Sequence, residues 1–230
     1  MDTPDEPTAR QRWQRVRDLE TPGRRVVLGQ NASWKLADDP RHLLFTFARY
    51  KHAARLLPRR PGKAVLELGC GEGLGAFFLA EGAGRVLGVD FDAAALEAAR
   101  AACDLPGVEF RQADFLGAAF GAFDGVVSLD VIEHIAPEAE EAFLRTLTAN
   151  LAPGGVCVVG TPNATAQAHA SPGSRIGHVN LYTGERLYES LTRHFANAFV
   201  FGLNDETLHT GFLPMCHYLL AAACGPRQAA

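Results

Sequence analysis

Three glycines on alternate positions, directly after a short apolar run, constrain this chain more than any other feature. In the segment VLELGCGEGLG, which begins at Val65, they are Gly69, Gly71 and Gly73. Glycines gather where a chain must turn sharply from a strand into a helix and where a ligand must come close to the main chain. We therefore expect a strand that ends at Leu68, followed by a ligand-binding loop.

Apolar strands and amphipathic helices alternate around this loop. Hydrophobic periodicity predicts strands at residues 64–68, 85–89, 108–111, 125–129, 156–160 and 197–203, and helices from residue 75 and at 93–102, 138–151 and 184–195. Two further helices are expected before the loop, one near Trp13 and one over residues 39–57. Such alternation predicts an α/β fold: a mostly parallel sheet with helices on both faces, an N-terminal helical cover, and a ligand site at the carboxyl ends of the strands.

The composition argues against several classes of protein. A chain of 230 residues, 47% of them hydrophobic, can bury the core of one domain. The net charge of −4, with acids and bases spread along the chain, offers no basic face for nucleic acid. The polar N-terminus lacks the apolar core of a signal peptide, and no apolar run approaches about 18 residues, so we expect a cytoplasmic protein that makes no contact with a membrane. The five cysteines form no CxxC pair, which argues against a disulfide framework and a cysteine zinc site.

The residues around the loop narrow the choice of ligand. A dinucleotide fingerprint would need a third glycine where Leu74 stands, and the chain has no nucleotide-triphosphate loop. Glu67, two residues before the first glycine, would repel a pyrophosphate but suits a cationic ligand. Asp90 ends the next strand, where a carboxylate can accept from both hydroxyls of a ribose, and Asp114 follows a third strand, where it can accept from the amine of adenine. These residues favour a nucleoside with a positively charged, phosphate-free arm, and S-adenosylmethionine fits that description.

The ordered set of these segments resembles the class I S-adenosylmethionine-dependent methyltransferases. The resemblance covers residues 49–160 and rests on VLELGCGEG, GVDFD, QADF, FDGVVSLDVIEHI and LAPGGVCVVGTPN. It implies a Rossmann-like sheet of seven strands. It also implies that Asp90 binds the ribose, that Phe91 lies against the adenine, and that Asp114 and Phe115 hold the base. The three glycines would line the methionine arm, Leu129 would close over the sulfur, and Glu67 would either contact the ligand or orient the loop.

Within that class, the pattern is similar to the O-methyltransferases of ubiquinone biosynthesis. Arg49 matches an arginine that would pair with the methionine carboxylate, or else it is a solvated helix arginine. Asp130, Glu133 and His134 match an acidic pair and a histidine that hold a divalent ion in some of those enzymes. Alternatively, the acid and the histidine only begin a helix and shape the pocket wall. Our predicted site contains no metal.

Two histidines are candidates for the general base that an oxygen or protonated nitrogen acceptor requires. His134 follows the fourth strand, and His178 lies in the long loop after the next strand, where acceptor-binding residues are expected. Either could instead be a pocket-wall residue. Near the C-terminus the polar side chains are dense enough to recognise a cationic or polyhydroxylated acceptor, although they are equally compatible with an exposed turn and a core histidine: they are Asn204, Asp205, Glu206, His209 and His217.

The predicted function is methyl transfer from S-adenosylmethionine to an oxygen, or a nitrogen, of a small molecule such as a sugar, an amino sugar or another biosynthetic intermediate. An N-methyltransferase of a small amine and a non-catalytic S-adenosylmethionine-binding subunit remain as alternatives. We expect one methyltransferase domain over residues 1–230, made of a helical cover (1–60), a donor-binding half (61–160) and an acceptor-side half (161–230). The sequence leaves a homodimer open and predicts no nucleic-acid or membrane partner.

Overall fold

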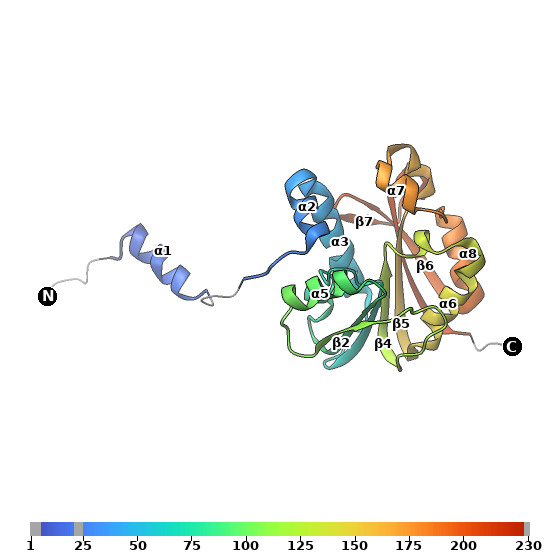
Figure 1. The fold of residues 1–230 in the computed structure, drawn as a ribbon, viewed down its shortest axis with the longest axis horizontal. Helices are drawn as coiled ribbons and strands as arrows, with labels where there is room; N and C mark the ends of the chain where they lie inside the picture. The colour runs from blue at the N-terminus through green and yellow to red at the C-terminus, as the bar shows by residue number, and fades with distance from the viewer. Residues whose placement is uncertain (1–5, 21–24, 228–230) are drawn as a thin grey trace.

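The computed structural model describes residues 6–20 and 25–227. One eight-stranded sheet forms its centre, with strand order β3-β2-β1-β4-β5-β8-β6-β7 (Figure 1). The strands are β1 (Lys63–Leu68), β2 (Ala83–Asp90), β3 (Val108–Gln112), β4 (Phe123–Leu129), β5 (Leu151–Pro162), β6 (Phe195–Asn204), β7 (Thr207–His209) and β8 (Tyr218–Pro226). The first five are parallel, whereas β8, β6 and β7 join by antiparallel pairing. The mostly parallel α/β prediction is confirmed.

The predicted number of seven strands is wrong by one. The additional strand β7 has three residues and pairs only with β6, as Gly202 with His209, Leu203 with Leu208 and Asn204 with Thr207. It turns back at the sheet edge beyond Asn204, through Asp205 with its positive φ of 50°. So short a strand carries no hydrophobic period that sequence reasoning could detect.

Helices cover both faces of the sheet, except for α1, which extends away from it and has no buried residue (Figure 1). The helices of the described residues are α1 (Ala9–Asp18), α2 (Gln30–Asp38), α3 (Pro40–Leu56), α4 (Ala76–Leu79), α5 (Ala93–Ala102), α6 (Glu140–Ala149), α7 (Pro172–Gly177) and α8 (Gly184–His194). Four 3-10 turns accompany them: η1 (Ile132–His134), η2 (Pro137–Ala139), η3 (Ala164–His169) and η4 (Leu213–Met215). The expected helix from residue 75 is a single turn, while α5 begins and ends where it was predicted.

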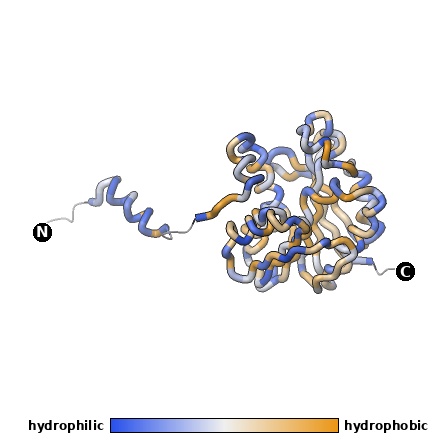
Figure 2. The backbone as a smooth tube through the Cα atoms, viewed as in Figure 1, coloured by the Kyte–Doolittle hydropathy of each residue, from blue (hydrophilic) through white to orange (hydrophobic). Residues whose placement is uncertain are grey.

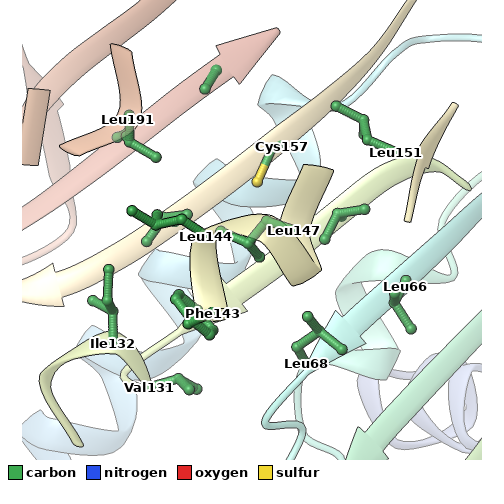
Figure 3. Close-up of a cluster of buried hydrophobic side chains, with 14 of the residues drawn as sticks. Leu66, Leu68, Val131, Ile132, Phe143, Leu144, Leu147, Leu151, Cys157 and Leu191 are labelled. Carbon is green, nitrogen blue, oxygen red and sulfur yellow. The ribbon is translucent and has the colours of Figure 1, made fainter. Parts of the chain in front are cut away.

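Two buried clusters hold these layers together. One packs α6 and α8, through Phe143, Leu144 and Leu191, against the strands (Figure 3). The other packs Tyr50 of α3 and Leu79 of α4 against the opposite face. Because helices cover both faces, β1 is a nearly continuous apolar run, as expected for a central parallel strand.

The hydropathy of the chain follows the same layering. Figure 2 shows hydrophobic residues gathered in the strands, whereas α1 is almost wholly hydrophilic and has no buried residue. None of the five cysteines, all of which lie in the described ranges, forms a disulfide. In the described part of the chain, none of the helices combines the length and the apolar character that a membrane span requires.

Candidate functional site

A cleft lies at the carboxyl ends of the parallel strands. It consists of two connected hollows of about 960 and 1250 Å³, which share Gly69, Gly71, Asp130 and His134 as lining residues. The first hollow extends between α2, α3 and the η3–α7 segment, and the second extends over the ends of β2 and β3. In Figure 1, α2 and α7 stand at the same end of the sheet. The location is the one expected for a ligand in an α/β sheet.

The second hollow brings together four of the predicted residues. Asp90 is buried at the end of β2, and its Oδ2 accepts from the Gly71 amide at 2.8 Å while its Oδ1 accepts from the Asp92 amide at 3.0 Å. Phe91 beside it is 72% exposed, so its ring face is free for a planar ligand. Asp114 and the buried Phe115 line the other side. Each Asp90 oxygen keeps a lone pair, so the carboxylate can still accept from ligand hydroxyls.

The three glycines of the loop do different things. A Cβ on Gly69 would stand 2.3 Å from Cγ2 of Val131, and a Cβ on Gly73 would stand 2.8 Å from Cβ of Ala99. Gly69 and Gly73 are therefore bare because protein packs against them. Gly71 has a φ of 50° and no heavy atom within 4 Å of its Cβ position, and it lines both hollows. Gly73 does not line either hollow.

Glu67 lies beneath the loop, outside the lining of the cleft. It is 1% exposed, and it packs next to Gly75 and the Tyr50 ring. Burial raises the pKa of Glu67 to about 8, and the nearby Tyr50 hydroxyl opposes the rise, although neither carboxylate oxygen has a hydrogen bond of normal geometry. The carboxyl group is thus placed to support the loop from below.

Arg49 is buried and already holds a carboxylate. Its Nη1 donates to both oxygens of Asp130 at 2.9 Å, and its guanidinium lies 4.0 Å above the Tyr218 ring. Burial would lower the pKa of Arg49, but Asp130, together with Tyr218 and Glu133, outweighs burial and raises it. Asp130 itself has a φ of 57°, an uncommon conformation for a residue other than glycine. The pair forms the floor of the first hollow, together with Leu129, which ends β4.

The two candidate bases meet edge to face. The ring centroids of His134 and His178 are 5.0 Å apart, and Nδ1 of His134 lies 2.8 Å from the Gly177 carbonyl oxygen. Since a carbonyl only accepts, Nδ1 of neutral His134 carries the proton and Nε2 keeps a lone pair. Burial lowers the pKa of His178, and His134 adds to the fall while Asp130 opposes it, so His178 is neutral near pH 7.

Glu133 joins this pair from below. It is fully buried, its Oε2 accepts from the Thr161 hydroxyl at 3.0 Å, and its Oε1 has no hydrogen-bond partner. Burial, reinforced by Asp130, raises the pKa of Glu133 to about 8. Ligand atoms of Glu133, His134 and His178 all lie within 4.8 Å of one another, which suits a cation held by one carboxylate and two imidazoles. Asp130, the other member of the predicted set, is instead paired with Arg49.

Sequence reasoning missed the contribution of α2. Both carboxylate oxygens of Glu72, a glycine-loop residue, accept from the first amides of this helix, those of Asn31 and Ala32, at 2.8 Å each. Charge on an acid at a helix N-terminus is stabilising. The contact holds α2 over the cleft, where Trp34 and Lys35 line the first hollow. The sequence carried one weak signal, an acid in the loop with no assigned role.

The polar C-terminal residues divide into two groups. Asp205 and His217 line the first hollow, where the His217 ring packs tilted against Phe45 at 5.7 Å between centroids and accepts from the Asp205 amide. Asn204 and His209 contact each other beside the sheet edge instead. Asp205 and His217 thus lie where acceptor recognition was predicted, whereas Asn204 and His209 do not line the cleft.

The family comparison agrees with this geometry. Residues 65–155 match the family model described as a methyltransferase domain, and this range contains the glycine loop, Asp90, Asp114 and His134. A probable S-adenosylmethionine-dependent methyltransferase of Mycolicibacterium smegmatis is 41% identical over 111 residues, which are 47% of this chain and 42% of that protein. Over this range the chain is thus similar to S-adenosylmethionine-dependent methyltransferases.

A second curated relative extends the comparison. The ubiquinone biosynthesis O-methyltransferase of Azorhizobium caulinodans is 34% identical over 125 residues, which are 53% of this chain and 49% of that protein. The chain thus spans less than half the length of these two curated relatives. The family-model match ends at residue 155, before the acceptor-side half of residues 161–230.

Solved structures share the fold at low identity. The N-methyltransferase NodS of Bradyrhizobium japonicum, bound to S-adenosyl-L-homocysteine, superposes with a TM-score of 0.61 at 23% identity over 84% of this chain and 92% of that chain. A putative methyltransferase of Haloferax volcanii, in complex with the Trm112 activator, gives 0.66 at 19% identity over 87% and 100%. At these identities the likeness establishes the fold alone.

Proposed function

We propose that this protein transfers a methyl group from S-adenosylmethionine to an oxygen, or a nitrogen, of a small-molecule acceptor. One observation carries the proposal: the hollow that holds Gly71 and the Asp130 floor also holds the His134–His178 pair. A donor site and a proton acceptor therefore open into one space. Methyl transfer is an in-line displacement, for which holding donor and acceptor in one dry cleft is the main contribution of the protein.

The adenosine of the donor would occupy the second hollow. In our proposal Asp90 accepts from the ribose hydroxyls, Phe91 lies against one face of adenine, and Asp114 with Phe115 holds the base edge. The support is their common position at the ends of β2 and β3. The methionine arm then passes Gly71, the one glycine of the three with open space before it, toward Leu129.

His134 is the proposed general base for a hydroxyl acceptor. As the acceptor oxygen bonds to the methyl carbon, the carbon–sulfur bond breaks and S-adenosylhomocysteine leaves with the electron pair on sulfur. The acceptor proton passes to Nε2 of His134, whose Nδ1 is kept protonated by the Gly177 carbonyl. His178, held edge-on, fixes the ring orientation. A cation on Glu133, His134 and His178 would instead lower the pKa of the acceptor hydroxyl.

The halves of the chain take the roles expected from the sequence in this proposal. Residues 61–160 supply the donor contacts, and residues 161–230 supply His178 and His217 to the acceptor side. The helices of residues 1–60 cover the cleft through α2 and α3. With helices on one side and the η3–α7 segment on the other, the first hollow suits a small molecule.

Two measurements test the proposal. Isothermal titration calorimetry with S-adenosylhomocysteine should show binding to the folded protein, and absence of binding would refute it. Transfer of labelled methyl to a panel of hydroxylated and amino compounds then identifies the acceptor. His134→Ala should lower turnover by about 100-fold or more while leaving S-adenosylhomocysteine affinity unchanged. His52→Ala, at a half-buried α3 histidine outside the cleft whose Nε2 lies 2.9 Å from the Glu206 carbonyl oxygen, is the matched control.

A further inference from the structure

Lys35 is a cation without a partner in the cleft. It lies on α2, is half-buried, and lines the first hollow together with Arg49 and Asp130. Its ammonium makes no hydrogen bond and no ion pair with any residue in the ranges 6–20 and 25–227. A half-buried ammonium has lost part of its hydration and gains from an anion placed beside it.

The acids nearest to Lys35 are already engaged. Asp130 is held by Arg49 through two hydrogen bonds, and Glu72 is held by the two amides at the start of α2. Burial lowers the pKa of Lys35; Asp130 and Glu72 oppose the fall, and Arg49 adds to it. The pKa of His42 is likewise lowered by burial and then by Lys35 and Arg49. Lys35 therefore lies near these groups, and neither Asp130 nor Glu72 forms an ion pair with its ammonium.

Because Arg49 is paired with Asp130, another cation is needed to pair with the donor carboxylate. Arg49 was the predicted partner of the donor carboxylate, but its Nη1 donates to Asp130 and one face of its guanidinium is covered by Tyr218, while its buried Nε has no hydrogen-bond partner. A carboxylate that approaches the Asp130 floor would meet a neutral ion pair. Lys35 lines the same hollow and forms no ion pair with a described residue.

We propose that Lys35 anchors a carboxylate-binding subsite, in which its ammonium pairs with the α-carboxylate of the donor's methionine arm. This inference rests on the proposed function, because it requires the donor in this cleft. A carboxylate on the acceptor would present the same chemistry to Lys35, and the experiment separates the two sources.

The position of Lys35 on α2 couples this subsite to the cover of the cleft. Lys35 stands four residues after Asn31, so both lie on one face of the helix, and both line the first hollow. Asn31 is the residue whose amide Glu72 holds. The glycine loop thus fixes the start of α2, and a bound carboxylate would fix its last turn.

Calorimetry with two donor analogues tests the subsite. S-adenosylhomocysteine carries the carboxylate, and decarboxylated S-adenosylhomocysteine lacks only that group. Lys35→Met should raise the Kd of the first by about tenfold or more and leave the Kd of the second unchanged. Lys35→Arg should restore most of the affinity, since charge is retained. Lys51→Met, an exposed lysine of α3 outside the cleft, should change neither value.

A third titration decides between the sources. Benzoate, with benzamide as its uncharged counterpart, is titrated into protein saturated with S-adenosylhomocysteine. If Lys35→Met leaves S-adenosylhomocysteine affinity intact but weakens benzoate binding selectively, the carboxylate belongs to the acceptor. If it alters neither, the subsite does not exist. Wild-type binding of S-adenosylhomocysteine in the same series reports separately on the proposed function.

Discussion

Replacing Gly71 by alanine should separate ligand binding from stability. The φ of 50° places this residue in the left-handed region, which costs an alanine about 1–2 kcal/mol. No heavy atom lies within 4 Å of the position that the new Cβ would take, so no packing penalty is added. The folded protein should therefore lose only about 1–2 kcal/mol of its free energy of unfolding.

The matched variant Gly69→Ala should behave in the opposite way. Its φ of 78° carries the same backbone cost, but the new Cβ would also stand 2.3 Å from Cγ2 of Val131. Overpacking of this kind typically costs a further 1–3 kcal/mol or so, which brings the expected loss to about 2–5 kcal/mol. Gly69→Ala is thus mainly a stability variant.

Urea unfolding and calorimetry with S-adenosylhomocysteine distinguish the two variants. Gly71→Ala should remain folded and lose affinity by about tenfold or more, since its methyl group would occupy the space through which the methionine arm passes. The reasoning would be refuted by wild-type affinity in a folded Gly71→Ala protein, because the donor would then not approach the main chain at this position. A loss of stability as large as that of Gly69→Ala would refute the packing assignment.

Three further perturbations have defined outcomes. Burial raises the pKa of Glu67 to about 8, so the folded state keeps a proton that the unfolded chain releases near 4.5, and wild-type stability falls as pH rises between these values. Glu67→Gln removes this dependence, so the stability of the variant relative to wild type, measured by urea unfolding, should be greater near pH 9 than near pH 5. An equal difference in stability at the two pH values would contradict the assignment. Glu72→Gln should weaken the cap on α2 by about 1 kcal/mol, visible as faster hydrogen exchange of the Asn31 and Ala32 amides, and unchanged exchange would show that the cap does not hold the helix. Treatment with a chelator should leave turnover unchanged, because the proposed base needs no metal; a loss that Mg²⁺ restores would place a cation on the Glu133 cluster instead.

Local signals were sufficient for most of the fold. Helix α5 was predicted to its end residues because Asp92 caps it, accepting from the Ala94 and Ala95 amides, and an alanine-rich run follows. Strand β8 was not predicted, since its run of alanines has low strand propensity. It belongs to the sheet only because β5 and β6 pair with it on either side. A strand that is stabilised mainly by pairing with strands far away in sequence cannot be predicted from its own residues.

The donor side of the cleft was likewise accessible from the sequence. Asp90 and Asp114 each follow a parallel strand, and the topology brings such strand ends to one edge. The distinction among the three glycines was not accessible. It depends on Val131 and Ala99, which approach Gly69 and Gly73 from elements far along the chain.

The roles of the charged residues depend on pairings that no local pattern contains. Arg49 and Asp130 are 81 residues apart in sequence, yet two hydrogen bonds join Nη1 of Arg49 to the Asp130 carboxylate. A resemblance assigns a role to each residue separately. The charge that a cleft presents to a ligand depends instead on which charged side chains pair with one another. Lys35, which has no place in the resemblance, lines this cleft and forms no ion pair with a described residue, so the proposed contact with a ligand carboxylate follows from the pairing of its neighbours and not from a motif.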